Sequence, residues 1–156
     1  MTARPTWAQP VAPRRRRAAV NDPLNPLEHV EQRRLADYLR ARGDLLWTHV
    51  PNESKRGARQ GRALKEAGMQ RGVPDVLIFN PFPLDSRVNR TCRACAGLAI
   101  ELKRVRGKGP TLEQRWWAEQ LALAGWRWDL CRGADAAIKV IEQAYGPPSA
   151  AGRRAA

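Results

Sequence analysis

The sequence contains few acidic residues, few cysteines and no long apolar segment. Its 156 residues include 15 Asp and Glu against 28 Lys and Arg, with three Cys and two His. Three cysteines are too few for a disulfide-stabilised scaffold. No apolar stretch approaches the roughly 20 residues that span a membrane, and the N-terminal residues MTARPTWAQPVAPRRRRAAV contain no apolar signal core. We therefore expect a cytoplasmic protein without membrane association.

The shortage of acids leaves a formal net charge of +13 at pH 7. Five arginines and one aspartate lie in residues 1–26 and two arginines in residues 146–156, yet the segment between them is also basic. Such an excess predicts a polyanionic partner, most simply nucleic acid. A compositional bias toward Arg, Ala, Gly and Pro is the alternative explanation.

The composition divides the chain into three parts. Residues 1–26 are rich in Pro, Arg and Ala and include RRRR at 14–17, which is typical of a disordered basic arm. Residues 146–156 are expected to be a disordered tail. Residues 27–145 are long enough to form one domain with a hydrophobic core.

Within this domain the apolar periodicity alternates between helical and strand spacing. We expect a helix that is capped by Asn25, has Pro26 in its first position and ends at Gly43. In the helix that begins after Thr111, Gln114 stands at the third position and completes a capping box. The other expected elements are a strand at 45–50, a helix at 58–67, strands at 76–80 and 98–104 that pair as an antiparallel hairpin, a strand at 126–131 and a helix at 133–146. The order α β α β β α β α predicts an α/β layered domain with a small mixed sheet.

Two charged residues lie within an otherwise apolar strand. Successive strand residues point to opposite faces, so Glu101 and Lys103 share one face while Ile100 and Leu102 line the other. A carboxylate and an amine in such a strand are costly to bury unless they are used. The common alternative for an E-x-K pattern is a solvated ion pair.

A third charged residue, Asp75, precedes the apolar strand VLIF. If residues 76–80 pair with 98–104, Asp75 lies close to Glu101, and two carboxylates on adjacent strands can bind a hard cation such as Mg²⁺. Lys103 can then orient water or stabilise negative charge on a phosphate. Asp75, Glu101 and Lys103 thus make a minimal set for phosphodiester cleavage, although Asp75 could be only a turn residue.

Four segments extend this pattern: HVPNE, GVPDVLIF, GLAIELKRVRGKGPTLEQRWWAEQLALAGW and CRGADAAIKVI. Together they resemble the virus-type replication-repair nuclease (VRR-NUC) domain, a branch of the PD-(D/E)XK nuclease superfamily that is common as a short phage protein. The resemblance covers roughly residues 27–145. It implies a restriction-endonuclease-like layered fold, with a small mixed central sheet flanked by helices.

The resemblance also implies roles for individual residues. Asp75, Glu101 and Lys103 correspond to the catalytic core, and the two carboxylates with the Leu102 carbonyl correspond to ligands of Mg²⁺ or Mn²⁺. Gln114 matches the family's helix glutamine, and its capping-box role is compatible with this. The first-helix glutamate of the family aligns with Glu28, for which the alternatives are Glu31, one turn away, and a solvated acid at Glu28.

Other residues are candidates for contacts with DNA. His49 and Asn52 fall in HVPNE, and the alternative for both is to stabilise a loop. Basic residues before the second strand can contact phosphates or form a solvated face. These residues are Arg56, Arg59, Arg62, Lys65 and Arg71.

The main departure from the family is a longer loop at 80–96. It contains Cys92 and Cys95 in a C-x-x-C spacing, which can supply half of a zinc site. No second pair lies nearby, so zinc would require a dimer that shares four cysteines. Unliganded loop cysteines are the simpler interpretation.

The sequence thus predicts a Mg²⁺- or Mn²⁺-dependent DNA endonuclease. Members of this branch include nucleases that act on branched or junction DNA, some as homodimers, in phage replication, recombination or repair. Two alternatives are a non-catalytic DNA-binding module of the same fold and a zinc-organised interaction adaptor.

Overall fold

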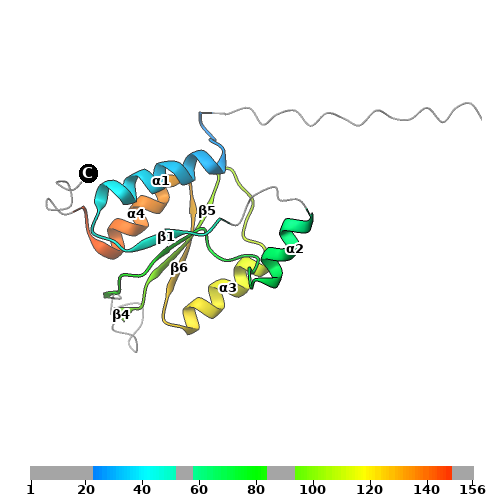
Figure 1. Cartoon of the computed structure of the whole chain (residues 1–156). Coiled ribbons are helices and arrows are strands. Elements are labelled where there is room, and N and C mark those ends of the chain that lie inside the picture. The colour runs from blue at the N-terminus through cyan, green and yellow to red at the C-terminus, as the bar shows by residue number, and fades with distance from the viewer. Residues whose placement is uncertain (1–22, 52–57, 84–93, 149–156) are drawn as a thin grey trace, which may run out of the picture.

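The eight predicted elements occur in the predicted order around a small sheet, and two further short strands are added between the fourth and the fifth (Figure 1). The computed structural model describes residues 23–51, 58–83 and 94–148, with the side chains of 58–61 excepted. In chain order the elements are α1 (Glu28–Arg42), β1 (Trp47–His49), α2 (Ala58–Glu66), β2 (Val76–Ile78), β3 (Phe82–Pro83), β4 (Ala94–Cys95), β5 (Leu98–Lys103), α3 (Leu112–Leu123), β6 (Arg127–Arg132) and α4 (Ala134–Tyr145).

The main sheet has four strands in the order β1-β2-β5-β6. Strand β2 pairs antiparallel with both β1 and β5, whereas β5 and β6 are parallel and are connected through α3. A parallel pair needs such a crossover connection, which α3 supplies. The mixed sheet and the antiparallel pairing of the second and third predicted strands are therefore confirmed.

The hydrophobic core lies between this sheet and helices α1 and α4, which pack side by side on one face (Figure 1). Helix α3 lies on the opposite side of the sheet, and none of its twelve residues is buried. Alternation along β2 and β5 directs their largest apolar side chains toward α1 and α4. The buried core residues are Leu35, Leu39, Val76, Ile78, Phe82, Cys95, Leu98, Ile100, Leu102, Cys131, Ala134, Ala137 and Ile141.

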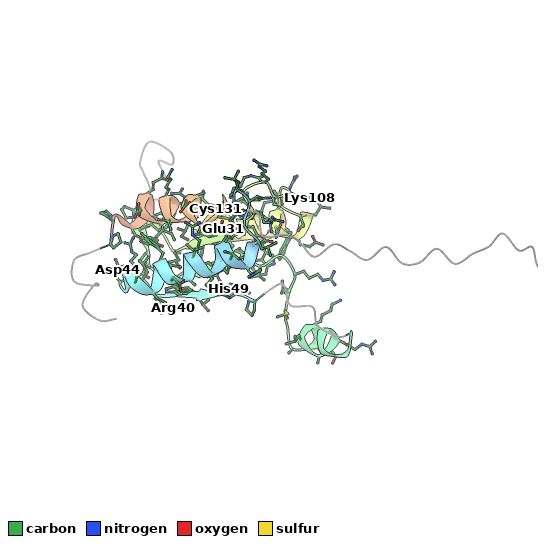
Figure 2. All side chains as sticks on the ribbon, turned by 90° about the horizontal axis from the view of Figure 1, so that it is seen from above. Glu31, Arg40, Asp44, His49, Lys108 and Cys131 are labelled. Carbon is green, nitrogen blue, oxygen red and sulfur yellow. The ribbon has the colours of Figure 1, made fainter. Side chains whose placement is uncertain are left out.

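Helix α2 projects from the body of the domain (Figures 1 and 2). It starts at Ala58, as predicted, and ends at Glu66, one residue before the predicted end. Gly68 follows shortly after with φ of 92°. Across residues 23–51, 58–83 and 94–148, we find no helix with the length and apolar character needed to cross a membrane.

The start of α1 differs from the prediction. The N-cap is Leu27, without a side-chain cap, so the prediction that Asn25 caps the helix and Pro26 opens it is wrong. The Asn25 side-chain oxygen instead accepts a hydrogen bond from the Arg106 amide at 3.1 Å, and Arg104 Nε donates to the Pro26 carbonyl at 2.9 Å. Hydrogen bonds from a distant turn therefore replace the local cap.

The predicted loop at 80–96 also differs in part. Its two ends form a short second sheet in which β3 pairs antiparallel with β4, with Phe82 opposite Cys95. Cys95 is 5% exposed and belongs to the hydrophobic core. Residues 84–93, which include Cys92, lie outside the described residues, so the zinc hypothesis stays a prediction.

A buried arginine joins the ends of α1 and α4. Arg42 is 1% exposed, and its guanidinium donates to Asp44 Oδ1 at 2.7 Å, to the Gly146 carbonyl at 2.7 Å and to the Tyr145 carbonyl at 3.2 Å. The last carbonyls of a helix have no intrahelical partner. Arg42 therefore stabilises the end of α4 while it fixes α1 beside that helix.

We expect Arg42→Met to lower the free energy of unfolding by about 2–3 kcal/mol, because it leaves two carbonyls and one carboxylate without their charged donor. Urea denaturation followed by circular dichroism measures this change. Arg40→Met is the matched control, since Arg40 pairs with Asp37 where both side chains are 65% exposed. Such a surface pair contributes less than about 1 kcal/mol. Equal losses of stability in the two variants would contradict the role of Arg42 in joining α1 to the end of α4.

Candidate active site

Asp75 and Glu101 lie on neighbouring strands and face the same side of the sheet. Val76 pairs with Ile100 in the antiparallel register of β2 and β5, so the next position places Asp75 opposite Glu101. Residues that oppose each other across a strand pair point to the same face. The Leu102 amide donates to Asp75 Oδ2 at 2.9 Å and holds this carboxylate against β5.

The Glu101 carboxylate is compensated on only one of its two oxygens. Its side chain is 1% exposed, with Lys103 Nζ at 2.6 Å from Oε1. Gln114 Nε2 donates to the same oxygen at 2.5 Å. Within the part of the chain that the structure describes, the buried Oε2 has no hydrogen-bond partner. A buried acceptor without a donor is costly, and a cation or a water from outside the chain would satisfy this oxygen.

The capping box at the start of α3 orients Gln114. Thr111 Oγ1 accepts from the Gln114 amide at 3.3 Å, and Gln114 Oε1 accepts from the Thr111 amide at 2.8 Å. Because the side-chain oxygen is bound to Thr111, its NH₂ group faces Glu101. The predicted capping box is confirmed, and the same side chain also contacts Glu101.

Helix α1 carries two glutamates one turn apart, and the structure separates their surroundings. Glu28 Oε1 lies 3.5 Å from Lys103 Nζ. Glu31 is 2% exposed, and its Oε2 accepts from the Ala134 amide at 2.7 Å. The N-cap of α4, Gly133, has no side chain to cap the helix, so Glu31 supplies the cap from α1. Glu28 is thus the first-helix glutamate that faces the site.

The electrostatics of the site bring opposite charges into one buried cluster. Burial raises the pKa of Glu101 to about 7, to which the charge of Asp75 contributes, although Lys103 lowers it. For Lys103, burial lowers the pKa, but the hydrogen bond and charge of Glu101 outweigh this and the net shift is upward. Lys103 therefore stays an ammonium ion, which suits stabilisation of negative charge rather than proton abstraction.

The loop that carries Asp75 rests on α3, a contact that the sequence analysis missed. Trp117 Nε1 donates to the Arg71 carbonyl at 3.0 Å. Gly72 has φ of 79°, and a Cβ there would lie 2.7 Å from the backbone carbon of Glu113. The glycine in RGVPD was the signal in the sequence that could have indicated this close contact. Helix α3 thereby positions both the Asp75 loop and, through its glutamine, Glu101.

The donor set suits a cation that keeps much of its hydration. No group of three or more His, Cys, Asp or Glu side chains among the described residues is arranged to hold a metal ion. Two carboxylates, Asp75 and Glu101, are nevertheless enough for Mg²⁺, which is usually bound by one or two carboxylates together with waters and substrate phosphates. The N–H and C=O of one strand residue point to the same side, so the Leu102 carbonyl faces the side of Asp75.

The remaining candidate residues lie on β1, on α2 and just before Gly72, or outside the described residues. His49 is exposed, and its Nδ1 lies 2.9 Å from the Asp75 carbonyl, a contact that stabilises the strand end. Arg62 and Lys65 are exposed on α2, Arg71 is exposed just before Gly72, and Arg59 lies in α2 with its side chain not described. Asn52 and Arg56 lie outside the described residues.

Comparison with known proteins supports the fold. No protein-family model and no curated protein matches the sequence. A solved structure of a VRR_NUC domain protein superposes with a TM-score of 0.56 and 20% sequence identity. The match covers 78% of this chain and 95% of the other. The chain therefore shares the fold of a VRR_NUC domain protein, as the sequence resemblance implied.

The two glutamates of α1 should respond differently to substitution. We expect Glu31→Ala to lower the free energy of unfolding by about 2 kcal/mol, because the Ala134 amide loses its buried acceptor. Glu28→Ala should change stability by less than about 0.5 kcal/mol, since its loss also relieves repulsion from Glu101. Urea titrations of both variants measure this difference, and a larger loss in Glu28→Ala would contradict the assignment.

Proposed function

We propose that the protein is a divalent-metal-dependent nuclease that hydrolyses phosphodiester bonds of DNA. The observation that carries this proposal is the buried Glu101 carboxylate, in which Lys103 and Gln114 occupy Oε1 while Oε2 has no partner among the described residues. Asp75 faces the same side from the adjacent strand. The fold shared with a VRR_NUC domain protein is consistent with this chemistry.

In this proposal Mg²⁺ or Mn²⁺ is bound by Asp75, Glu101 and the Leu102 carbonyl. The bound cation would supply charge neutralisation at the phosphate and activation of water for in-line attack. The carboxylates of Asp75 and Glu101 are hard oxygen ligands, which both cations prefer. Zinc at Cys92 and Cys95 is not required.

The other residues of the site act on charge and position. Lys103, held protonated between Glu101 and Glu28, lies where it can stabilise negative charge that develops on the phosphate. Gln114 fixes the Glu101 carboxylate so that Oε2 stays directed away from Lys103. Glu28 restrains the lysine and adds negative charge near the cation.

The substrate and setting form the finer part of the proposal. A net charge of +13 supports a nucleic-acid substrate. We propose branched or junction DNA as the preferred structure, a homodimer as the assembly that would cut symmetric junctions, and phage replication, recombination or repair in the host cytoplasm as the setting. A panel of duplex, flap, splayed and four-way DNA substrates with Mg²⁺ and Mn²⁺ tests the preference.

Nicking of supercoiled plasmid tests the activity itself. We expect Mg²⁺ to support nicking and a chelator to abolish it. Asp75→Asn and Lys103→Ala should each lower the rate by about 10²–10³-fold, since one removes a cation ligand and the other removes the ammonium. Lys139→Ala, an exposed position on α4, is the control and should keep the wild-type rate.

Activity that survives both the chelator and the Lys103→Ala substitution would contradict the nuclease proposal. Binding of DNA without any cleavage, over the substrate panel and with both cations, would favour a non-catalytic DNA-binding module instead.

Gln114→Glu separates the two roles of this side chain. A glutamate can still accept from the Thr111 amide, so the capping box of α3 should be retained. The variant replaces the donor that faces Glu101 with a second carboxylate, and we expect the cleavage rate to fall at least about tenfold. Gln120→Glu adds the same charge at an exposed position of α3 and is the matched control. Equal rates in the two variants would contradict the role of Gln114.

A further inference from the structure

The turn that follows β5, residues 104–110, lies directly against the proposed catalytic lysine. The Gly107 amide donates to the Arg104 carbonyl at 2.8 Å and closes the turn. A Cβ on Gly107 would lie 2.9 Å from that carbonyl oxygen and 3.4 Å from Lys103 Cβ. The close approach leaves no room for a side chain, and it brings the rest of the turn beside Lys103.

Hydrogen bonds from two other parts of the domain hold this turn in place. Arg132 Nη1, from the end of β6, donates to the Gly107 carbonyl at 2.5 Å. On the other side, Asn25 Oδ1 accepts from the Arg106 amide, and the Arg104 guanidinium binds the carbonyls of Asn25 and Pro26. The turn is therefore anchored to both β6 and the start of α1, which fixes where its side chains emerge.

Three cations emerge from this anchored structure. Arg106, Lys108 and Arg132 are exposed, and over residues 23–51, 58–83 and 94–148 none of them forms an ion pair. Arg132 is the register partner of Lys103 across β5 and β6, so both side chains point to the same face of the sheet. Lys108 lies at the opposite end of the domain from Arg40 and Asp44 (Figure 2).

The anchored turn and its position beside Lys103 set this cluster apart from the exposed cations on the helices, such as Arg33 and Lys139. Elsewhere in the domain, Arg34, Arg40, Arg42 and Arg127 each pair with a nearby carboxylate. Arg106 and Lys108 flank Gly107, whose carbonyl Arg132 binds, so the three cations belong to one region of the surface, and an anion from outside would relieve their mutual repulsion. Since Arg132 uses one nitrogen to hold the turn, its other donors stay available for phosphate oxygens.

We propose that Arg106, Lys108 and Arg132 form a second phosphate-binding site, which holds a backbone phosphate next to the scissile one on the strand being cut. This inference rests on the proposed nuclease function, which defines the strand being cut. It contacts the sugar–phosphate backbone without reading base sequence, because its donors come from flexible cationic side chains at the rim of the site. It would fix the register of the strand relative to Lys103.

The test measures binding of the full chain to a fluorescent DNA duplex by anisotropy, in chelator and over a range of NaCl concentrations. The Arg106→Ala/Lys108→Ala variant changes two exposed side chains. It keeps the hydrogen bond that the backbone amide of residue 106 donates to Asn25 Oδ1. Two lost phosphate contacts should weaken binding by at least about tenfold and lower the slope of log K against log [NaCl] by about 2. In Mg²⁺ the same variant should raise KM more than it lowers kcat.

The matched control is Arg33→Ala/Lys139→Ala. It removes the same two charges from exposed positions on α1 and α4, the helices that cover the other face of the sheet. The control should keep the wild-type slope. Equal losses in the two double variants would show an effect of net charge alone and would overturn the site, as would a wild-type chain that does not bind DNA.

Failure of the nuclease proposal gives a different result. Suppose that the wild-type chain cuts no DNA in Mg²⁺ or Mn²⁺, and that Arg106→Ala/Lys108→Ala, unlike the control variant, lowers the DNA affinity and the salt slope. The phosphate site then stands and the nuclease proposal fails. If the wild-type chain cuts DNA and the two double variants bind alike, the phosphate site alone is overturned.

Discussion

A carboxylate that is 1% exposed must find compensation for both of its oxygens, and Glu101 finds it within the described residues for one. Lys103 and Gln114 converge on Oε1 from β5 itself and from the first turn of α3. Two donors on one oxygen hold the carboxylate in a single orientation and leave Oε2 directed elsewhere. The rest of the domain can be understood as the structure that keeps this arrangement buried and fixed.

Each helix that borders the site also performs a structural task. The same glutamine side chain that contacts Glu101 closes the capping box of α3. Helix α1 supplies Glu31 as the cap of α4, which sets the rotation of α1 and thereby directs Glu28 toward Lys103. Coupling of this kind means that the geometry of the site depends on contacts that also hold the fold together.

Much of the fold could be predicted from the sequence because it depends on local periodicity. The E-x-K strand, the strand after Asp75 and the Thr111 cap all follow from spacing within a few residues. The assignment of Asn25 as a helix cap failed because a turn some 80 positions away competes for that side chain. The choice between Glu28 and Glu31 could not be made locally either, since it depends on where α4 begins. The short β3–β4 pairing was missed because two-residue strands leave no periodic pattern.

The most direct test of the central claim is a crystal structure of the full chain with Mn²⁺, in which anomalous scattering locates the ion without reference to activity. We predict a peak at coordination distance, about 2.1 Å, from Glu101 Oε2 and from the Asp75 carboxylate, with the Leu102 carbonyl beside it. A crystal grown in saturating Mn²⁺ that shows no peak between Asp75 and Glu101, or that shows Oε2 directed away from the ion, would contradict the proposed cation site.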